Sequence, residues 1–246
     1  MDESGKNGSG PPSPAHLATT LDAGERHYRA WVGPPDRYDI MGAAQFSLLF
    51  LLGMREHHKL LDFGCGSLRL GRLAIPYLGR GCYCGVEPEA WLIEDGFGQE
   101  LGQDARVIKQ PRFNHNAEFR ADMFDEKFDY IVAQSVFSHT GEIATRDALK
   151  SLGNVLADDG LILANWLIGE EAGGFHPETS GWVYPDCVPF SIERISRLID
   201  EAGLVSRRCP WPHAGRLTWF VLARGEAALP SEGSLDMLAV KPLWRP

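Results

Sequence analysis

The sequence predicts a doubly wound α/β domain, with a mostly parallel sheet of about seven strands, an antiparallel last strand and helices on both faces. Short apolar segments of strand length alternate with segments whose apolar residues recur at helical spacing. The segment Tyr130-Ile131-Val132-Ala133 has the apolar order typical of a buried parallel strand. The 246 residues, 44% of them apolar and 23% charged, fit a globular protein of one domain.

Both ends of the chain are expected to lie outside that domain. Residues 1–20 are polar and rich in Gly, Pro and Ser, which predicts a disordered tail. The apolar pattern weakens after Arg224, so residues 225–246 are predicted to form a loosely attached C-terminal tail. A single domain is therefore expected over 21–224.

The domain is predicted to begin with a helical prelude over 21–58, which would act as a lid. Within it, a short helix is expected over 21–30, and Gly33-Pro34-Pro35 would end it. An apolar helix over 41–54 follows, with a turn before the first strand.

The remaining elements follow in alternation. Strands are expected at 59–63, 81–86, 106–109, 129–134, 161–166, 204–209 and 217–223. Helices are expected at 68–78, 91–101, 143–156 and 192–202. Ser191 is a good N-cap for the last helix, and Gly203 a good stop. The Gly- and Pro-rich loop 167–190 is predicted to cover the substrate, and the short connection between the last two strands predicts an antiparallel pair.

Charge and composition argue against several classes of partner. The 24 basic and 33 acidic residues give a formal charge of −9, which disfavours nucleic acid. No apolar run approaches the roughly 18 residues that a membrane-spanning helix needs. The first residues lack the apolar core of a signal peptide, which predicts a cytoplasmic protein with no membrane partner. The five cysteines are scattered and suit free thiols, and no metal site is expected from their spacing.

The loop after the first strand carries the clearest functional signal. Gly64 and Gly66 place small residues at a strand-to-helix turn, where the backbone can approach a nucleotide-type ligand closely. Arg69 stands where a G-x-G-x-x-G motif would need its third glycine, and no GK[ST] phosphate loop follows. A dinucleotide pyrophosphate or an ATP triphosphate is thus a poor fit.

The segment Asp62-Phe63-Gly64-Cys65-Gly66 resembles the nucleotide loop of the class I S-adenosylmethionine-dependent methyltransferases. An acidic residue at the end of the second strand, Glu87, matches that family's second marker. Two further stretches, Phe128 to Val132 and Leu156 to Gly160, are similar to its fourth strand and the end of the following helix. The resemblance covers about residues 38–223, is close to a bacterial small-molecule subgroup, and implies a Rossmann-like fold.

The resemblance implies a set of cofactor-binding residues. They are Tyr38, Asp62, Gly64, Cys65, Gly66, Arg69, Glu87, Pro88, Phe113, Asn114, Gln134 and Ser135. Glu87 would bind the ribose hydroxyls, because a carboxylate can accept from both. Asp62 as a simple turn cap, Arg69 as part of a solvated helix face, and the choice between Phe113 and Asn114 for the adenine stay open.

His139 is the candidate catalytic residue, because an imidazole with a near-neutral pKa follows the fourth strand on the loop that would face the transferred methyl group. The alternative is a histidine that only shapes the loop, and His115, His176 and His213 are other candidate bases. Trp182 and Tyr184 are expected to wall the substrate pocket, with a plain hydrophobic lid core as the alternative.

The implied activity is transfer of a methyl group from S-adenosylmethionine to an oxygen or nitrogen of a small molecule, leaving S-adenosylhomocysteine. A sugar or a secondary metabolite is the expected acceptor, which would make the enzyme one of natural-product biosynthesis. A protein or peptide methyltransferase and a non-catalytic cofactor-binding module are the alternatives, and a homodimer is left open.

Overall fold

The computed structural model describes residues 17–169 and 175–239. Residues 1–16, 170–174 and 240–246, which belong to the predicted tails and covering loop, lie outside the described residues. The strands form a mixed sheet in the order β3-β2-β1-β4-β5-β8-β7, and a short strand, β6, pairs with β5. This order confirms the predicted doubly wound α/β class.

The sheet is parallel except at one edge. Its strands are β1 (Leu60–Phe63), β2 (Tyr83–Val86), β3 (Arg112–Asn114), β4 (Phe128–Ala133), β5 (Leu156–Ile168), β6 (Pro189–Phe190), β7 (Val205–Cys209) and β8 (Thr218–Ala223). Strand β8 runs antiparallel to both β5 and β7, as the short connection between the last two strands predicts. The two-residue strand β6 is the one beyond the predicted seven.

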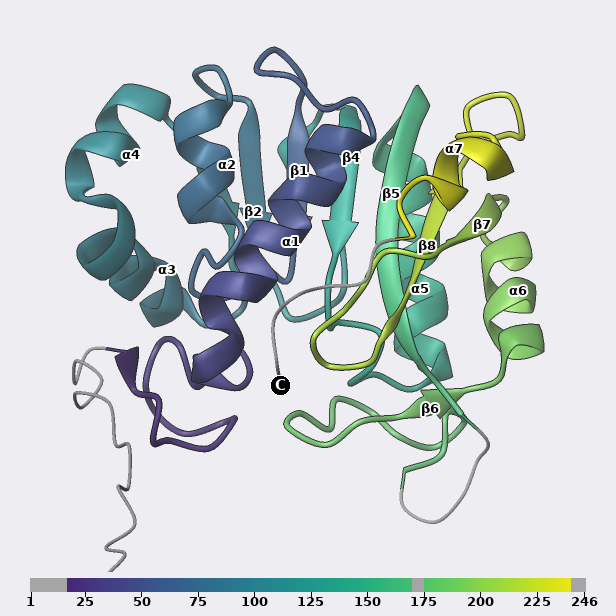
Figure 1. Cartoon of the computed structure of the whole chain (residues 1–246), viewed down its shortest axis with the longest axis horizontal. Coiled ribbons are helices and arrows are strands. Elements are labelled where there is room, and N and C mark those ends of the chain that lie inside the picture. The colour runs from purple at the N-terminus through teal and green to yellow at the C-terminus, as the bar shows by residue number, and fades with distance from the viewer. Residues whose placement is uncertain (1–16, 170–174, 240–246) are drawn as a thin grey trace, which may run out of the picture.

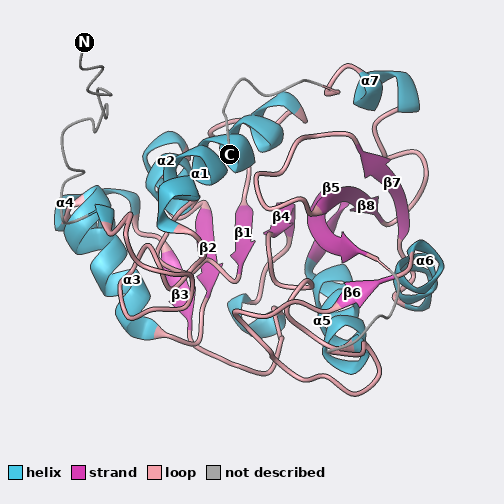
Figure 2. Ribbon diagram, turned by 60° about the horizontal axis from the view of Figure 1, so that its bottom comes forward, coloured by secondary structure: helices cyan, strands magenta, loops and turns pink. Residues whose placement is uncertain are grey.

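Helices cover both faces of the sheet. They are α1 (Tyr38–Leu51), α2 (Gly71–Tyr77), α3 (Ala90–Gly96), which continues as a π-helix over Phe97–Leu101, α4 (Gln103–Lys109), α5 (Glu142–Val155), α6 (Ile192–Glu201) and α7 (Glu232–Asp236). Figure 1 shows α1, α2 and α7 in front of the strands, and Figure 2 shows α5 on the opposite side of the sheet.

Each face of the sheet has its own apolar core. On one face, Leu149 and Leu152 of α5 and Leu198 of α6 pack against the sheet. On the other face, Leu48 of α1 and Ile75 of α2 do the same. Ser191 caps α6 as predicted, since its hydroxyl accepts a hydrogen bond from the backbone N–H of Arg194.

The third strand is not where the sequence analysis places it. Residues 106–109, predicted as a strand, form the second half of the surface helix α4, and the strand is β3, a few residues later. Val107 and Ile108 are both largely exposed on α4, so the apolar pair that indicates a buried strand is in fact on the surface.

Both ends of the domain also differ from expectation. Residues 21–30 form turns and not the predicted short helix. Beyond Arg224, the short helix α7 places Leu235 in the core, together with Leu229 and Leu238. This part of the predicted tail is therefore attached more closely than the weak apolar pattern suggests.

Two irregular segments lie at the carboxyl end of the parallel strands. One is residues 17–37, the N-terminal cover, drawn in purple at the bottom of Figure 1, and the other is residues 175–190, the covering loop, drawn in green. They lie where ligands bind in open α/β sheets. Within the described residues, no helix has the length and apolar character that crossing a membrane requires.

Candidate active site

A cavity of about 590 Å³ opens at the carboxyl ends of β1, β2 and β4. Its walls come from the glycine loop after β1, the loops after β2 and β4, helix α1, the N-terminal cover and the covering loop. This volume is in the range of small-molecule and cofactor sites.

The glycine loop has a backbone that glycine is needed to form. Gly64 and Gly66 both have positive φ angles, +77° and +52°. A Cβ atom at Gly64 would come within 2.6 Å of Val136, and one at Gly66 equally close to Val32 of the N-terminal cover. The loop is therefore packed tightly between β4 and the cover while it exposes its backbone to the cavity.

Two carboxyl groups face the cavity from neighbouring strands: Asp62 in β1, which is buried, and Glu87 directly after β2, which is partly buried. The Asp62 carboxylate accepts a hydrogen bond of 2.7 Å from the Tyr83 hydroxyl, and burial raises the pKa of Asp62 to about 6. The Glu87 carboxylate accepts from the backbone N–H groups of Gly66 and Glu89, at 3.0 Å each. Burial raises the pKa of Glu87 to about 7. Each carboxylate oxygen has a second lone pair, so both groups can still accept from a ligand.

Arg69 is buried, which excludes the alternative that it belongs to a solvated helix face. One guanidinium nitrogen, Nη1, donates to the carbonyl of Val32 at 2.6 Å. The Nε atom is buried without a hydrogen-bond partner, and Arg69 has no carboxylate ion pair among the described residues. Burial lowers the pKa of Arg69. A buried cation in this position is costly until an anionic or strongly polar ligand meets it.

Two glutamine side chains complete this polar part of the cavity wall. Gln45 lies on the buried face of α1, and its Oε1 atom has no partner among the described residues. Gln134, at the end of β4, has its Nε2 atom in the same state. Together with Arg69 Nε, these atoms are two donors and one acceptor that are shielded from solvent behind the cavity wall without a partner, which is unusual for buried polar groups.

His139 lies in the cavity wall with one ring nitrogen engaged. Its Nδ1 atom is 2.6 Å from the carbonyl oxygen of Asp186. A carbonyl only accepts, so Nδ1 carries the proton and Nε2 is left with its lone pair. Burial, with the added effect of Arg69, lowers the pKa of His139, and the imidazole is neutral at pH 7.

The covering loop brings aromatic rings next to His139. Tyr184 lies edge-on to the imidazole with ring centroids 4.9 Å apart, and Trp182 is 5.8 Å away. The Tyr184 hydroxyl is 3.4 Å from the carbonyl oxygen of Ala30 in the N-terminal cover. The two covers thus touch each other across the mouth of the cavity.

The covering loop is anchored to the start of α5 by its backbone. Val183 N–H donates to His139 O at 2.9 Å, and Val188 N–H to Ser138 O at 2.8 Å. A Cβ atom at Gly141 would overlap the Ser180 carbonyl oxygen, so only glycine allows this approach.

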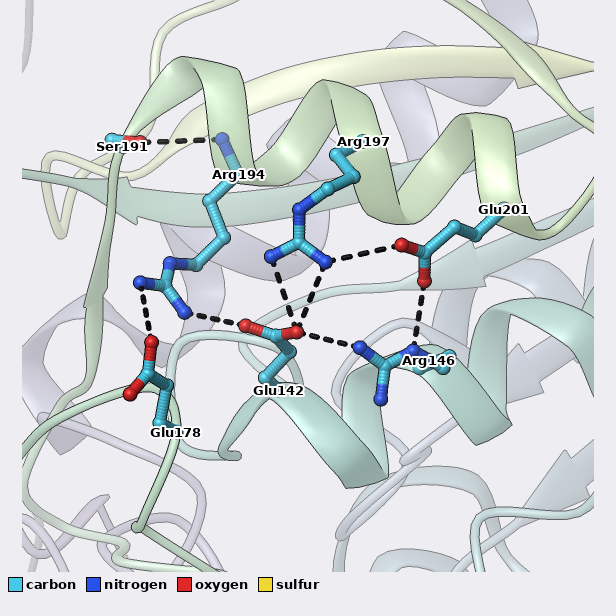
Figure 3. Close-up of polar contacts among 7 residues, drawn as sticks. All are labelled: Glu142, Arg146, Glu178, Ser191, Arg194, Arg197 and Glu201. Atoms are coloured by element: carbon cyan, nitrogen blue, oxygen red, sulfur yellow. Dashed lines mark hydrogen bonds and ion pairs between the residues drawn. The ribbon is translucent and has the colours of Figure 1, made fainter.

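A buried glutamate strengthens that anchor. Figure 3 shows the Glu142 carboxylate among Arg146, Arg194 and Arg197, with Arg194 also reaching Glu178 of the covering loop. Glu201 binds Arg146 and Arg197 on the other side and has no contact with the loop in this network. Glu142 therefore connects α5, α6 and the covering loop.

The structure brings most of the predicted site residues together. The cavity is lined by Asp62, Gly64, Cys65, Gly66, Arg69, Glu87, Pro88, Gln134, Ser135, His139, Trp182 and Tyr184. Tyr38 lies beneath the loop instead, fully buried, with its hydroxyl donating to Ser67 O at 3.0 Å.

Phe113 and Asn114, predicted to contact the adenine, are not in the cavity wall. Phe113 packs between Tyr83 and Phe97, because its side chain points to the face covered by α3. The Asn114 amide oxygen accepts two hydrogen bonds from Asn116. Asn116 and Ala117 line the cavity in their place.

Several lining residues were missed by sequence reasoning. Asn116 follows from placing the third strand correctly, and Gln45 had a signal as a lone amide within an apolar helix. Val32, Phe119 and Pro185 had none, since they lie in irregular segments.

The other candidate bases lie elsewhere. His115 is exposed, with Nδ1 2.8 Å from Glu87 O, and His213 does not line this cavity. Burial, reinforced by nearby Arg69 and Arg37, lowers the pKa of His213 to about 3. Among residues 17–169 and 175–239, no three His, Cys, Asp or Glu side chains gather as a metal site would require.

Comparison with known proteins agrees with this geometry. A family model described as a methyltransferase domain matches residues 61–162, which run from β1 into β5. The matched region includes both carboxyl groups and the glycine loop.

Solved structures share the fold at low sequence identity. The magnesium protoporphyrin IX methyltransferase from Synechocystis PCC 6803, solved with S-adenosylhomocysteine, is 12% identical with a TM-score of 0.56, over 78% of this chain and 84% of that chain. A Clostridium acetobutylicum S-adenosylmethionine-dependent methyltransferase is 11% identical with a TM-score of 0.55, over 76% and 92%. Streptomyces venezuelae DesVI is 14% identical with a TM-score of 0.55, over 77% and 92%.

The sheet order, the motif Asp62-Phe63-Gly64-Cys65-Gly66 beside the cavity and the match to a methyltransferase domain over residues 61–162 thus show that the chain has the fold of the class I S-adenosylmethionine-dependent methyltransferases and is similar to a methyltransferase domain around its cavity.

Proposed function

We propose that this protein is a class I S-adenosylmethionine-dependent methyltransferase, which transfers the methyl group of S-adenosylmethionine to an oxygen or nitrogen atom of a small molecule. The observation that carries the proposal is the enclosure of the cavity by two covers that meet where Tyr184 approaches Ala30. A protein or peptide acceptor would need an open groove at this place. A small acceptor fits under the covers, which would shield the reacting atoms from solvent once the ligands are bound.

The unused polar atoms of the cavity fit the methionine end of the cofactor. Arg69 Nε and Gln134 Nε2 would donate to its carboxylate, and Gln45 Oε1 would accept from its ammonium group, once small side-chain movements bring these buried atoms to the cavity surface. Glu87 would accept from the ribose hydroxyls, with Asn116 and Ala117 next to the adenine. Asp62 would face the cationic part of the ligand.

The cofactor supplies an activated sulfonium methyl group when it is bound. Because the methyl group needs no further activation, the chain's own contribution is positioning, exclusion of water and, for a hydroxyl acceptor, removal of a proton. The Nε2 lone pair of His139 suits that last task. An amine acceptor can lose its proton to solvent instead.

Solved relatives of the fold are named for small-molecule chemistry. They include the magnesium protoporphyrin IX methyltransferase and a methyltransferase of calicheamicin biosynthesis. These names support a role in small-molecule biosynthesis. A sugar or another secondary metabolite as the acceptor, and a cytoplasmic location, stay predictions from the sequence, which leaves a homodimer open.

Calorimetric titration with S-adenosylmethionine and S-adenosylhomocysteine tests the cofactor site. We expect both to bind the wild-type protein, and Glu87→Ala to raise the dissociation constant roughly tenfold or more, through loss of a charge-assisted hydrogen bond. Glu94→Ala is the matched control, because Glu94 pairs with Arg106 on the exposed surface of α3 and α4. Absence of binding by the wild-type protein would refute the proposal.

His139→Ala tests the catalytic role. We expect it to bind S-adenosylhomocysteine as the wild type does, and to lose roughly 100-fold or more of the methyl transfer to a hydroxyl acceptor. Radiolabelled methyl transfer from the cofactor to a library of small molecules provides the measurement. Unchanged transfer in the variant would leave His139 with only a structural role.

A further inference from the structure

Four rings form an aromatic wall where the covering loop closes the cavity: His139, Phe119, Trp182 and Tyr184. Trp182 and Tyr184 stack with centroids 6.2 Å apart and planes inclined by 30°. The ring centroids of Phe119 and Trp182 lie 6.3 Å apart. All four line the cavity, and the Trp182 side chain is 55% exposed although it is large and apolar.

The aromatic wall carries no formal charge at pH 7. The charged side chains that line the cavity are Asp62, Arg69, Glu87 and Glu89, and all come from β1 and the loops after β1 and β2. These loops belong to the part of the cavity proposed to hold the cofactor. An acceptor bound beside the cofactor therefore contacts the faces and edges of the rings in the aromatic wall.

This chemistry discriminates between classes of acceptor. A sugar needs partners for several hydroxyl groups, and unpaired polar groups at an apolar wall are costly. A carboxylate or phosphate needs a cation, and the four rings supply none. Arg69, whose charge acts on His139 and Tyr184, is proposed to bind the methionine carboxylate of the cofactor instead. A flat aromatic molecule gains both apolar contact and ring stacking on Trp182 and Tyr184.

The single base of the wall also selects its substrate. His139 Nε2 is a weaker base than a free imidazole, because burial and the charge of Arg69 lower its pKa more than the hydrogen bond from Nδ1–H to Asp186 O raises it. A phenol has a pKa of about 10, as tyrosine does, whereas a simple alcohol is about as weak an acid as water, with a pKa near 16. A weak base removes the proton of the phenol far more readily.

Building on the methyltransferase function proposed above, we propose that the acceptor is an uncharged aromatic compound with a phenolic hydroxyl, stacked on Trp182 and Tyr184 with its hydroxyl at His139 Nε2. Nε2 takes the hydroxyl proton while the oxygen forms its bond to the methyl carbon. The carbon–sulfur bond breaks and its electron pair stays on sulfur. The products are an aryl methyl ether and S-adenosylhomocysteine, and His139 releases the proton to solvent.

Binding to the full chain saturated with S-adenosylhomocysteine tests the acceptor class without requiring turnover. The probes are a panel of uncharged phenols with one to three fused rings, the matched aromatic carboxylates, and methyl glucosides, all measured by calorimetry. We expect at least one phenol to bind roughly tenfold tighter than its carboxylate counterpart and than every glucoside.

Trp182→Ala provides the structural arm. Because this side chain is largely exposed, its removal leaves the fold intact, and we expect it to weaken phenol binding roughly tenfold. Phe50→Ala is the control, an exposed aromatic residue on α1 outside the cavity, and should leave phenol binding unchanged. His139→Gln should still bind the phenol but should no longer form the aryl methyl ether, which mass spectrometry detects.

The outcomes separate the two proposals. Failure of S-adenosylhomocysteine to bind overturns the proposed function and the acceptor class with it. If it binds, three results overturn the acceptor class alone: no phenol of the panel binds at millimolar concentration, the carboxylates or glucosides bind tighter, or Trp182→Ala leaves phenol affinity unchanged.

Discussion

Asp62, which is buried, and Glu87, which is partly buried, are carboxyl groups whose charge is an unfavourable feature of the ligand-free protein. Their pKa values are raised to about 6 and about 7 because burial disfavours the carboxylate. In such a case the folded state binds more protons than the unfolded state at pH values between the unfolded and folded pKa. The contribution of each group to stability therefore falls as the pH rises through this window.

Asp62→Asn removes one of these charges while keeping an oxygen that can accept from the Tyr83 hydroxyl. Since the pKa of Asp62 rises from 3.8 to about 6, the charged state costs the fold about 3 kcal/mol above pH 6. We expect the ligand-free variant to melt on the order of 5–10 °C higher than the wild type at pH 7.5. Near pH 4 the difference should vanish.

Differential scanning calorimetry across pH 4–8 measures this difference. Equal melting temperatures at pH 7.5 would show that Asp62 is charged there without cost. The same variant should bind S-adenosylmethionine more weakly, so that stability and ligand affinity change in opposite directions.

Residue chemistry was the most predictable part of the site. Asp62, Gly64, Gly66 and Glu87 follow strand ends, and strand ends of parallel sheets converge on one edge. Residues held by irregular segments were not predictable, because no periodic pattern places Val32 of the N-terminal cover over a glycine 34 positions later in the chain, at Gly66. The burial of Arg69 likewise depends on that cover.

Individual elements were predictable where apolar periodicity and burial agree. Strands β1, β4 and β8 and helices α1, α5 and α6 lie close to their predicted positions. The exposed Val107 and Ile108 of α4 break this agreement, and their β-branched side chains favour a strand in any local analysis. Tertiary structure decides whether such a segment forms a helix or a strand. Here β3 pairs with β2 at the edge of the sheet, and residues 106–109 remain helical.

The covering loop and α5 act as one element because Glu142 joins them. We expect Glu142→Gln to loosen the covering loop, since Arg194 loses its buried anion and Glu178 its fixed partner. Hydrogen exchange of residues 175–190 should become faster. Glu201→Gln is the matched control, since Glu201 shares Arg146 and Arg197 but holds no part of the loop in this network.

The same pair of variants reports on His139. In the wild type, Asp186 O fixes the proton on Nδ1. We expect the nitrogen chemical shifts of His139 to move toward a mixture of tautomers in Glu142→Gln and to stay unchanged in Glu201→Gln. Identical spectra in both variants would show that Glu142 has no part in positioning the base.

At the scale of the whole molecule, the −9 charge and the carboxyl groups of the cavity favour a cationic ligand. S-adenosylmethionine carries a sulfonium charge that S-adenosylhomocysteine lacks. Binding it favours the carboxylate forms of Asp62 and Glu87, so protons are released on binding below about pH 7. The affinity for S-adenosylmethionine should therefore rise with pH between 5 and 8, more steeply than that for S-adenosylhomocysteine.

Titrations in buffers of different ionisation enthalpy at pH 6.5 count the released protons. We expect more protons to be released with S-adenosylmethionine than with S-adenosylhomocysteine, and Asp62→Asn to reduce the difference. Equal proton release for both ligands would place the sulfonium away from these carboxyl groups.

The hydrogen bond from Arg69 to the Val32 carbonyl couples the N-terminal cover to ligand affinity. The Nε atom of the same guanidinium has no partner among the described residues, so a ligand that binds and immobilises Arg69 also immobilises the backbone at Val32. Such coupling is reciprocal: a change that loosens the cover weakens the ligand by the factor by which the ligand tightens the cover. Hydrogen exchange around Val32, slowed by S-adenosylhomocysteine in the wild type and not in Arg69→Met, would measure this coupling. Substitutions in the N-terminal cover, which contacts the ligand site through Arg69, can therefore change ligand affinity during evolution without altering the site itself.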